Sequence, residues 1–398
     1  MSIIDQANGH ELRLVPRVGA TIHELVARTP LRTVMVVAIL SRLFVFVVAV
    51  AANYVFGVNP TCNSFGCWSI DLPFFNLLSR WDSGFYADIA LHGYGNQIVA
   101  KWEFFPMYPI LMGIFGRLLA ATSPLPLDLA VHVAGFALSN LFFLAAVYFL
   151  YRLSEGILRQ TSLAFESALF LAIYPAGVFL SATYSESLFL VLTLSSLYYW
   201  YVKRMGKSGV LGFLAALTRP VGVILAVPYL YELLFNSVNR RSPRMYLPIL
   251  GVLLGYLSFM AYSQLMTGTP FANFDAARLY WKVAPDPIAI LTLARREIFD
   301  HPIIVPYLVL GVGGVLASLA TARSQAEKAI GLYAICLIAS YLPTPIISFP
   351  RYSITLVPMY WGLSKLSRWP LVRGLMYAIF LVLLAIGTGL FVNWYSFY

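Results

Sequence analysis

Charged residues are scarce in this chain of 398 residues: 11% are Asp, Glu, Lys or Arg, whereas 60% are hydrophobic. An ordinary soluble domain carries about 25% charged residues, so this composition excludes a typical water-soluble protein. The apolar residues gather in stretches long enough to cross the hydrocarbon core, which takes about 20 residues per helix. These stretches contain Gly and Pro and lack sustained alternation, which favours helices over strands. The sequence predicts an all-α integral membrane protein.

Cysteines are also few, and no segment has the composition of a linker. Cys62 and Cys67 are close enough in sequence to form a small disulfide in an oxidising space, or else remain free thiols.

No Gly/Ser linker, charged tail or low-complexity block marks a second domain, so we expect one transmembrane domain over residues 1–398. We expect no cleavable signal, because residues 1–30 are polar and the first apolar run, 31–56, is too long for a signal core.

Basic residues outnumber acidic ones by 27 to 17, and most lie beside apolar stretches, as orientation in a bilayer requires. We therefore expect residues 1–30 on the inner membrane surface, a cytoplasmic N-terminus, about eleven spans and an outer C-terminus. The expected spans are residues 31–56, 127–151, 163–180, 187–202, 209–217, 221–235, 246–266, 302–321, 329–342, 354–366 and 371–391.

Residues 104–121 decide this topology. They are apolar enough to span, but a crossing there would move Arg152 and Arg159 to the outer side and break the charge pattern. We therefore expect a half-embedded helix within the first outer loop, 57–126, and a second large outer loop at 267–301.

The short helices 209–217 and 221–235 should be separated at Arg219-Pro220, because proline breaks the regular hydrogen bonding of a helix. Broken backbone at membrane depth needs protein or a wet cavity around it, so Arg219 should line a cavity.

The outer loops hold the candidate catalytic residues. Asp82 lies in the run Arg-Trp-Asp-Ser-Gly-Phe-Tyr at 80–86, and an acid among aromatics beside a bilayer is costly and usually functional. A carboxylate accepts a proton from a positioned hydroxyl group, and arginines hold phosphate oxygens while keeping their charge. This combination suits glycosyl transfer from a lipid-phosphate sugar, in which charge develops on both the sugar and the phosphate. We expect Asp82 as general base and Arg219 and Arg351 as ligands of the donor phosphate.

Further candidates lie near these three residues. Those for substrate binding are Arg80, Trp81, His92, Tyr108, Tyr184 and Glu186, and those for a second acid are Asp88 and Glu103. Glu103 by itself ranks no higher than a solvated loop charge. We expect no obligatory cofactor, because two arginines would neutralise the phosphate and no dense Asp/His cluster is present; a divalent metal is left open.

Purely structural interpretations of the same residues stay open. Asp82 can cap a helix or pair with Arg80, and an acid at the position of Glu186 often caps the helix that follows. Arg219 can pair with Glu186 and do nothing else, and Arg351 can extend to the outer headgroups.

Several segments together resemble the PIG-V mannosyltransferases and their prokaryotic relatives. They are the run at 80–86, Phe-Phe-Pro-Met-Tyr-Pro at 104–109, Pro-Ala at 175–176, Tyr-Ser-Glu-Ser-Leu-Phe at 184–189, Thr-Arg-Pro-Val-Gly at 218–222 and, more loosely, Pro-Arg-Tyr at 350–352. Eukaryotic members of that family use dolichyl-phosphate-mannose to extend a glycolipid anchor. In the GT-C superfamily to which they belong, the acid of the first outer loop is taken as catalytic base, which carries onto Asp82. Eukaryotic members have an Arg-Ser-Asn-Gly type sequence where this chain has Arg219-Pro220-Val221-Gly222.

The resemblance implies an inverting GT-C glycosyltransferase of a prokaryotic plasma membrane with its active site on the outer face. A hexose, most simply mannose, would pass from a polyprenyl-phosphate sugar to a glycolipid or other membrane-proximal hydroxyl group; no nucleic acid is expected as a partner. A secondary transporter or lipid flippase is the alternative from another class, since broken helices with charged residues occur there too. An inactive scaffold of the same fold is the other. The absence of a convincing internal repeat favours the enzyme.

Overall fold

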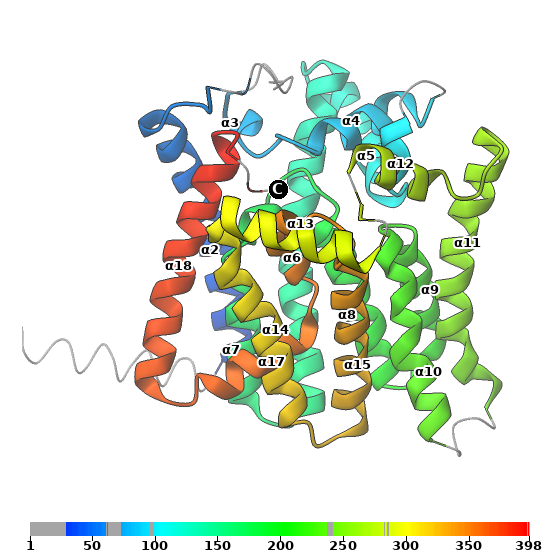
Figure 1. Ribbon diagram of the computed structural model, residues 1–398, viewed down its shortest axis with the longest axis vertical. Coiled ribbons are helices and arrows are strands. Elements are labelled where there is room, and N and C mark those ends of the chain that lie inside the picture. The colour runs from blue at the N-terminus through cyan, green and yellow to red at the C-terminus, as the bar shows by residue number, and fades with distance from the viewer. Residues whose placement is uncertain are drawn as a thin grey trace, which may run out of the picture.

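The computed structural model describes residues 29–60, 62, 73–95, 99–236, 242–281, 283–284, 286–395 and 397. Every regular element within these ranges is a helix, which confirms the predicted all-α class (Figure 1). The expected inner-face segment 1–30 lies outside the described residues up to position 28, as does Cys67. Cys62 is disulfide-bonded and Cys336 is free.

Five helices are long and apolar enough to cross a membrane, and each matches a predicted span to within a few residues at most of its ends. They are α2 (Pro30–Val55), α6 (Leu127–Leu158), α11 (Leu247–Thr267) with the preceding η6 (Pro243–Tyr246), α14 (Val305–Ala320) with η7 (Pro302–Ile304), and α18 (Pro370–Val392). The exception is α6, which continues about two turns beyond the predicted end at position 151.

Six other predicted spans correspond to helices of 10–17 residues, so the count of eleven crossings stays a prediction. These helices are α7 (Thr161–Ala172), α8 (Glu186–Tyr201), α9 (Met205–Ala216), α10 (Ala226–Phe235) with η4 (Pro220–Leu225), α15 (Gln325–Tyr341) and α17 (Val357–Leu366). The predicted break at Arg219 is confirmed, because α9 ends at Ala216 and the backbone of Arg219 is extended.

The prediction of one continuous helix over 163–180 is wrong. Helix α7 ends at Ala172, and the chain continues through a turn into η3 (Gly177–Leu180). Pro175 explains the break, since proline supplies no backbone N–H and disfavours helical geometry at the preceding residue. Arg42 of α2 satisfies carbonyl groups freed by the break: its Nη1 donates to Gly177 O at 2.6 Å and its Nη2 to Ala172 O at 3.2 Å.

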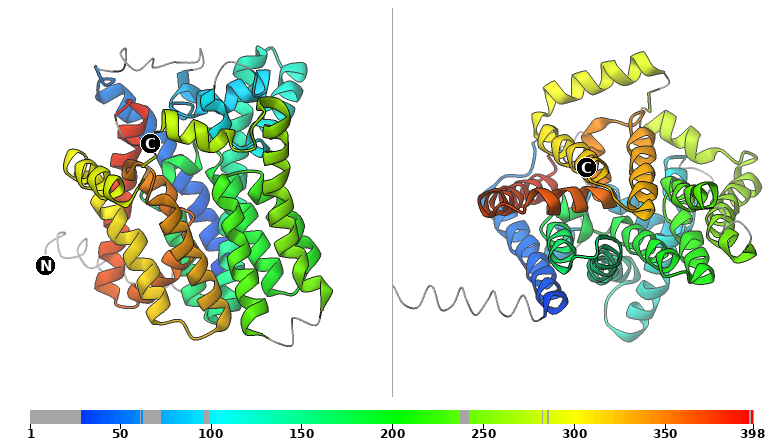
Figure 2. Two further views of the ribbon diagram at one scale, coloured as in Figure 1. Left: turned by 45° about the vertical axis from the view of Figure 1, so that its right-hand side comes forward. Right: turned by 90° about the horizontal axis from the view of Figure 1, so that it is seen from below.

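One end of the molecule collects the elements of the two predicted outer loops (Figure 1). They are α3 (Pro73–Asn76), α4 (Ser83–His92), η2 (Val99–Glu103), α5 (Met107–Thr122) and α12 (Ala272–Tyr280). Below them α13 (Pro287–Asp300) lies across the outside of the bundle (Figure 2). Between α15 and α17 the chain forms η8 (Ile346–Ser348) and α16 (Phe349–Ser353).

Helix α5 corresponds to the expected half-embedded helix. Its first residue, Met107, donates its N–H to Leu217 O at 3.0 Å, beside the end of α9. Further along, Gly116 packs directly on Val131 of α6. The helix thus begins next to the break at Arg219 and ends at the end of the molecule that carries α4 and α12 (Figure 1). Its depth in a bilayer stays a prediction.

Helices α14 and α17 pack backbone against backbone, which fixes the segment that carries Arg351. A Cβ atom at Gly362 of α17 would collide with the carbonyl oxygen of Gly314 in α14. We expect Gly362→Ala to destabilise the folded protein by about 1–3 kcal/mol through overpacking, measured as a lower melting temperature in detergent. Gly313→Ala is the matched control, because a Cβ at Gly313 meets nothing within 4 Å. Equal melting temperatures for the two variants would contradict this packing.

Candidate active site

Asp82 occupies the start of α4, where its side chain does not cap the helix. Trp81 before it adopts a positive φ of 56°, which turns the chain so that Arg80 and Asp82 face different surroundings. The backbone N–H of Asp82 donates to the hydroxyl oxygen of Tyr184 at 3.1 Å. The structure therefore excludes two of the structural interpretations: the Asp82 carboxylate neither caps α4 nor pairs with Arg80.

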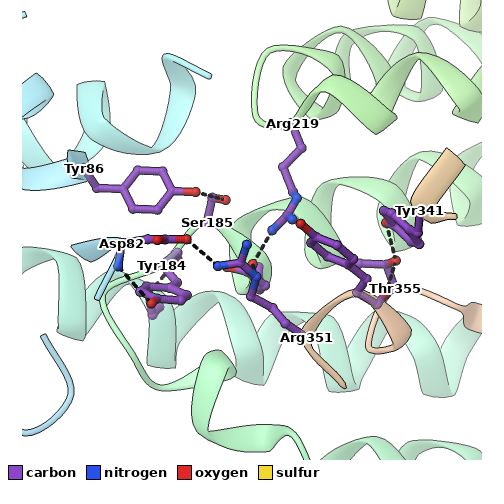
Figure 3. A network of polar contacts seen from close by, with 11 residues as sticks. Asp82, Tyr86, Tyr184, Ser185, Arg219, Tyr341, Arg351 and Thr355 are labelled. Carbon is purple, nitrogen blue, oxygen red and sulfur yellow. Dashed lines mark hydrogen bonds and ion pairs between the residues drawn. The ribbon is translucent and has the colours of Figure 1, made fainter. Parts of the chain in front are cut away.

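The carboxylate of Asp82 instead meets Arg351 of α16, which lies 269 residues further along the chain (Figure 3). Arg351 Nη1 donates to Asp82 Oδ2 at 2.5 Å, and Arg351 Nε lies 3.3 Å from Glu186 Oε1. Burial would lower the pKa of Arg351, but the neighbouring carboxylates of Asp82 and Glu186 raise it well above its ordinary value. Arg351 is therefore a permanently charged group held between two acids, and not a side chain that extends to the headgroups.

Arg219 brings a second guanidinium group to the same place. Its Nη1 donates to Glu186 Oε1, so Glu186 at the start of α8 holds both arginines. The guanidinium carbons of Arg219 and Arg351 lie 5.6 and 5.3 Å from the ring centre of Tyr352. Tyr352 itself stacks on Tyr341 with ring centres 4.4 Å apart. The two cations are thus fixed side by side, in the arrangement that a phosphate group with several oxygens requires.

A cavity of about 330 Å³ opens onto Asp82, Arg219 and Arg351. Small-molecule sites measure about 300–1,000 Å³, so this volume is at the lower end of the range. Glu186 does not line the cavity, and its side chain is only 1% exposed. Its observed contacts are those of a residue that positions the two arginines.

Glu103 lines this cavity, so it is not the solvated loop charge that the sequence suggested. Burial raises the pKa of Glu103 to about 8, against the opposing influence of Arg219 and Arg351 and with a further contribution from Asp82. Near neutral pH its carboxyl group is therefore largely protonated and carries a proton that it can donate. The other candidate second acid, Asp88, pairs with Lys101 and with His92 and is absent from the cavity lining.

Four other expected substrate-binding residues also lie outside the lining of this cavity. Tyr184 is fully buried with its ring 5.5 Å from the guanidinium carbon of Arg351, and Tyr108 bonds Ser139 at 2.7 Å. Trp81 Nε1 donates to the carbonyl oxygen of Phe391 at 3.1 Å. Arg80 is 4% exposed and contacts Asn53 and the ring of Trp394. These four residues therefore pack within the protein and do not face the cavity.

Sequence reasoning missed the contribution of the segment predicted as the second outer loop, 267–301. Asn273 of α12 and Trp281 just after it line the cavity, together with Tyr256 of α11. The available signal was a tryptophan and an amide side chain in a polar stretch of a membrane protein. Within the described ranges, no group of three or more His, Cys, Asp or Glu side chains is arranged to hold a metal ion.

The fold and the site together define a polytopic helical membrane protein with an acid and two arginines around one cavity. A family model described as mannosyltransferase (PIG-V) matches residues 25–276, which is more than half of the chain. The protein belongs to the PIG-V mannosyltransferase family, as its motifs predict.

Individual proteins agree with this assignment. GPI alpha-1,6-mannosyltransferase 2 of Rattus norvegicus is 33% identical over 202 residues, which covers 50% of this chain and 39% of the rat protein. GPI mannosyltransferase 2 of Yarrowia lipolytica is 29% identical over 173 residues, which covers 42% of this chain and 44% of the yeast protein. The chain thus matches less than half the length of either relative.

The fold is similar to that of AglB, the archaeal oligosaccharyltransferase of Archaeoglobus fulgidus, solved in complex with an inhibitory peptide and a dolichol-phosphate. The TM-score is 0.50 at 14% sequence identity, and the alignment covers 94% of this chain and 56% of AglB. At this identity the likeness concerns the fold alone, and it agrees with the GT-C membrane fold that the resemblance to the PIG-V family implies.

Proposed function

We propose that this protein transfers a mannosyl group from a polyprenyl-phosphate-mannose to a hydroxyl group of a membrane-linked acceptor, on the outer face of a prokaryotic plasma membrane. The observation that carries the proposal is the meeting of Asp82, Arg219 and Arg351 at one cavity of sugar size. Membership of a mannosyltransferase family and the names of the relatives support the choice of mannose. The dolichol-phosphate bound by AglB supports a lipid phosphate as the leaving group.

In the proposed reaction Asp82 accepts the proton of the acceptor hydroxyl group. Its Oδ2 is engaged by Arg351, and no hydrogen bond to its Oδ1 occurs within the described part of the chain, so Oδ1 is available as the base. The acceptor oxygen forms a bond to the anomeric carbon while the bond from that carbon to the phosphate oxygen breaks. The electron pair leaves with the polyprenyl phosphate, and attack from the opposite face inverts the anomeric configuration.

Arg219 and Arg351 stabilise the negative charge that grows on the phosphate as this bond breaks. Such stabilisation is effective because both guanidinium groups are already held in place by ion pairs and are largely shielded from solvent. Glu186 supports the reaction indirectly by keeping the two cations beside each other.

The direct test is incubation of the purified protein with polyprenyl-phosphate-mannose and a membrane lipid extract, followed by mass analysis of the lipids. The proposal predicts a lipid heavier by one hexose residue and an equal amount of free polyprenyl phosphate. A flippase would redistribute the donor between leaflets of a vesicle without forming a new covalent product. An inactive scaffold would do neither.

The raised pKa of Glu103 predicts a pH dependence of donor binding. Glu103 is neutral below about pH 8 and becomes a carboxylate above it, within a cavity that also contains Asp82, Arg219, Arg351 and Tyr256. The added negative charge should oppose the anionic phosphate, so the affinity for the donor should fall by about tenfold as the pH rises through 8. Titration of the donor at several pH values measures this fall. Glu103→Gln should bind with little change over the same range, and an equally steep fall in Glu103→Gln would contradict the assignment.

A further inference from the structure

A second group of side chains lines the cavity beside the acid and the two arginines. It comes from three elements: Glu103 ends η2, Tyr256 lies in α11, and Asn273 and Trp281 lie in and just after α12. Helix α12 packs directly on η2, which brings the first and second outer loops together. Because these four residues line the same cavity as Asp82, Arg219 and Arg351, the group lies beside the proposed reacting centre.

Asn273 has the environment of a residue that awaits a ligand. It is 2% exposed, and its Oδ1 has no hydrogen-bond partner among the residues that the structure describes. A buried amide oxygen without a partner is unfavourable unless a ligand supplies a donor. Its neighbour Tyr256 carries a hydroxyl group into the same lining, and this hydroxyl group interacts with the Asn273 side chain.

Trp281 adds a flat apolar surface next to these polar groups. Its ring lies 5.7 Å from that of Phe85 and 5.6 Å from that of Phe104, measured between ring centres, so its orientation is fixed by packing. A pyranose ring has hydroxyl groups at its edge and C–H bonds on its faces. Polar groups that can form hydrogen bonds with hydroxyl groups, next to an aromatic ring, therefore suit such a sugar.

We propose that Glu103, Tyr256, Asn273 and Trp281 form the subsite that binds the hexose ring of the donor and selects it by its hydroxyl groups. This inference rests on the proposed function. We assign the subsite to the donor sugar and not to the acceptor. The donor sugar is attached to the phosphate through a single oxygen atom, so it must lie in the same cavity as Arg219 and Arg351, which bind that phosphate. The acceptor needs to present only one hydroxyl group to Asp82.

The subsite has a consequence for specificity. A site that hydrogen-bonds hydroxyl groups rejects a ligand lacking them more strongly than an apolar pocket does, because its own buried polar groups lose their partners. Bare polyprenyl phosphate should therefore bind more weakly than polyprenyl-phosphate-mannose, and the difference between the two affinities should depend on Asn273 and Tyr256.

The test measures the dissociation constants of polyprenyl phosphate and polyprenyl-phosphate-mannose for the full protein in detergent, without acceptor. In the unchanged protein the sugar-bearing lipid should bind at least tenfold more tightly. Asn273→Ala and Tyr256→Phe should each reduce this preference by about tenfold and leave the affinity for bare polyprenyl phosphate unchanged. Tyr262→Phe is the matched control: it makes the same change on the same helix, at a residue that packs on Tyr94 outside the cavity lining.

Two results would overturn the subsite: variants that retain the full preference for the sugar-bearing lipid, and variants that weaken both lipids equally. If Asn273→Ala fails to fold, Trp281→Ala replaces it, since Trp281 is only half-buried and the same loss of preference is expected. A protein that binds neither lipid and transfers no sugar would contradict the proposed function itself. A protein that transfers mannose while its subsite variants keep their preference would contradict this inference alone.

Discussion

Replacement of Asp82 by asparagine is expected to lower the rate of mannosyl transfer by about 10²–10⁴-fold, the usual contribution of a general base. Asparagine has nearly the same shape as aspartate but cannot accept the proton of the acceptor hydroxyl group. The variant also frees Arg351 from its ion pair, so binding of the anionic donor should not weaken. The measurement is the initial rate of product formation by mass analysis, together with a titration of the donor.

Asp88→Asn is the matched control for this change. Asp88 lies on the same helix, but it pairs with Lys101 and His92 and does not line the cavity. Transfer by Asp88→Asn should therefore stay within about twofold of the unchanged protein, because the Asp88 carboxylate contacts neither the cavity nor the two arginines. If Asp82→Asn transferred mannose at the normal rate, Asp82 would not be the base.

Replacement of Arg351 by alanine is expected to lower transfer by about 10²–10³-fold, the loss seen when one stabilising group of a transition state is removed. Arg351 contacts Asp82 and Glu186 at once, so its loss also removes a cation from the half-buried carboxylate of Asp82 and from the buried carboxylate of Glu186. Donor affinity should fall as well, because only Arg219 then faces the phosphate. Rates and donor dissociation constants measured on the same preparation separate the two effects.

Two further variants separate charge from folding. Arg351→Lys keeps the positive charge but lacks the planar fork that contacts two groups, so its rate should lie between those of alanine and arginine. Arg296→Ala removes an exposed arginine on α13 and should change nothing, because its partner Asp300 is also at the surface. A fully active Arg351→Ala with a lowered melting temperature would assign Arg351 to stability and not to the reaction.

The sequence predicted those parts of the protein that depend on local patterns. The long apolar runs predicted the five long helices. The proline after Arg219 predicted the helix break that places this arginine at the cavity. Asp82 was recognisable because an acid among aromatics at a membrane surface is costly. Pro175 is a signal of the same kind, and it explains why α7 is shorter than the predicted span 163–180.

The pairing of these residues depends on tertiary packing and was not visible in the sequence. Nothing in the sequence places Arg351 nearer to Asp82 than Arg80, which is two positions away, but the positive φ of Trp81 turns the neighbouring side chains apart. The role of Glu103 follows from the packing of α12 on η2, which encloses a residue that looks solvated in a loop. Asn273 lies even further from the motifs in sequence, and only the folded chain brings it to the cavity.

The decisive measurement is the mass of acceptor lipids after incubation of the purified protein with polyprenyl-phosphate-mannose, run in parallel with Asp82→Asn. The meeting of Asp82 and the two arginines at one cavity predicts a gain of one hexose per acceptor with the unchanged protein and almost none with the variant. Equal products from the two proteins would contradict it. So would movement of intact donor across a vesicle membrane with no covalent product.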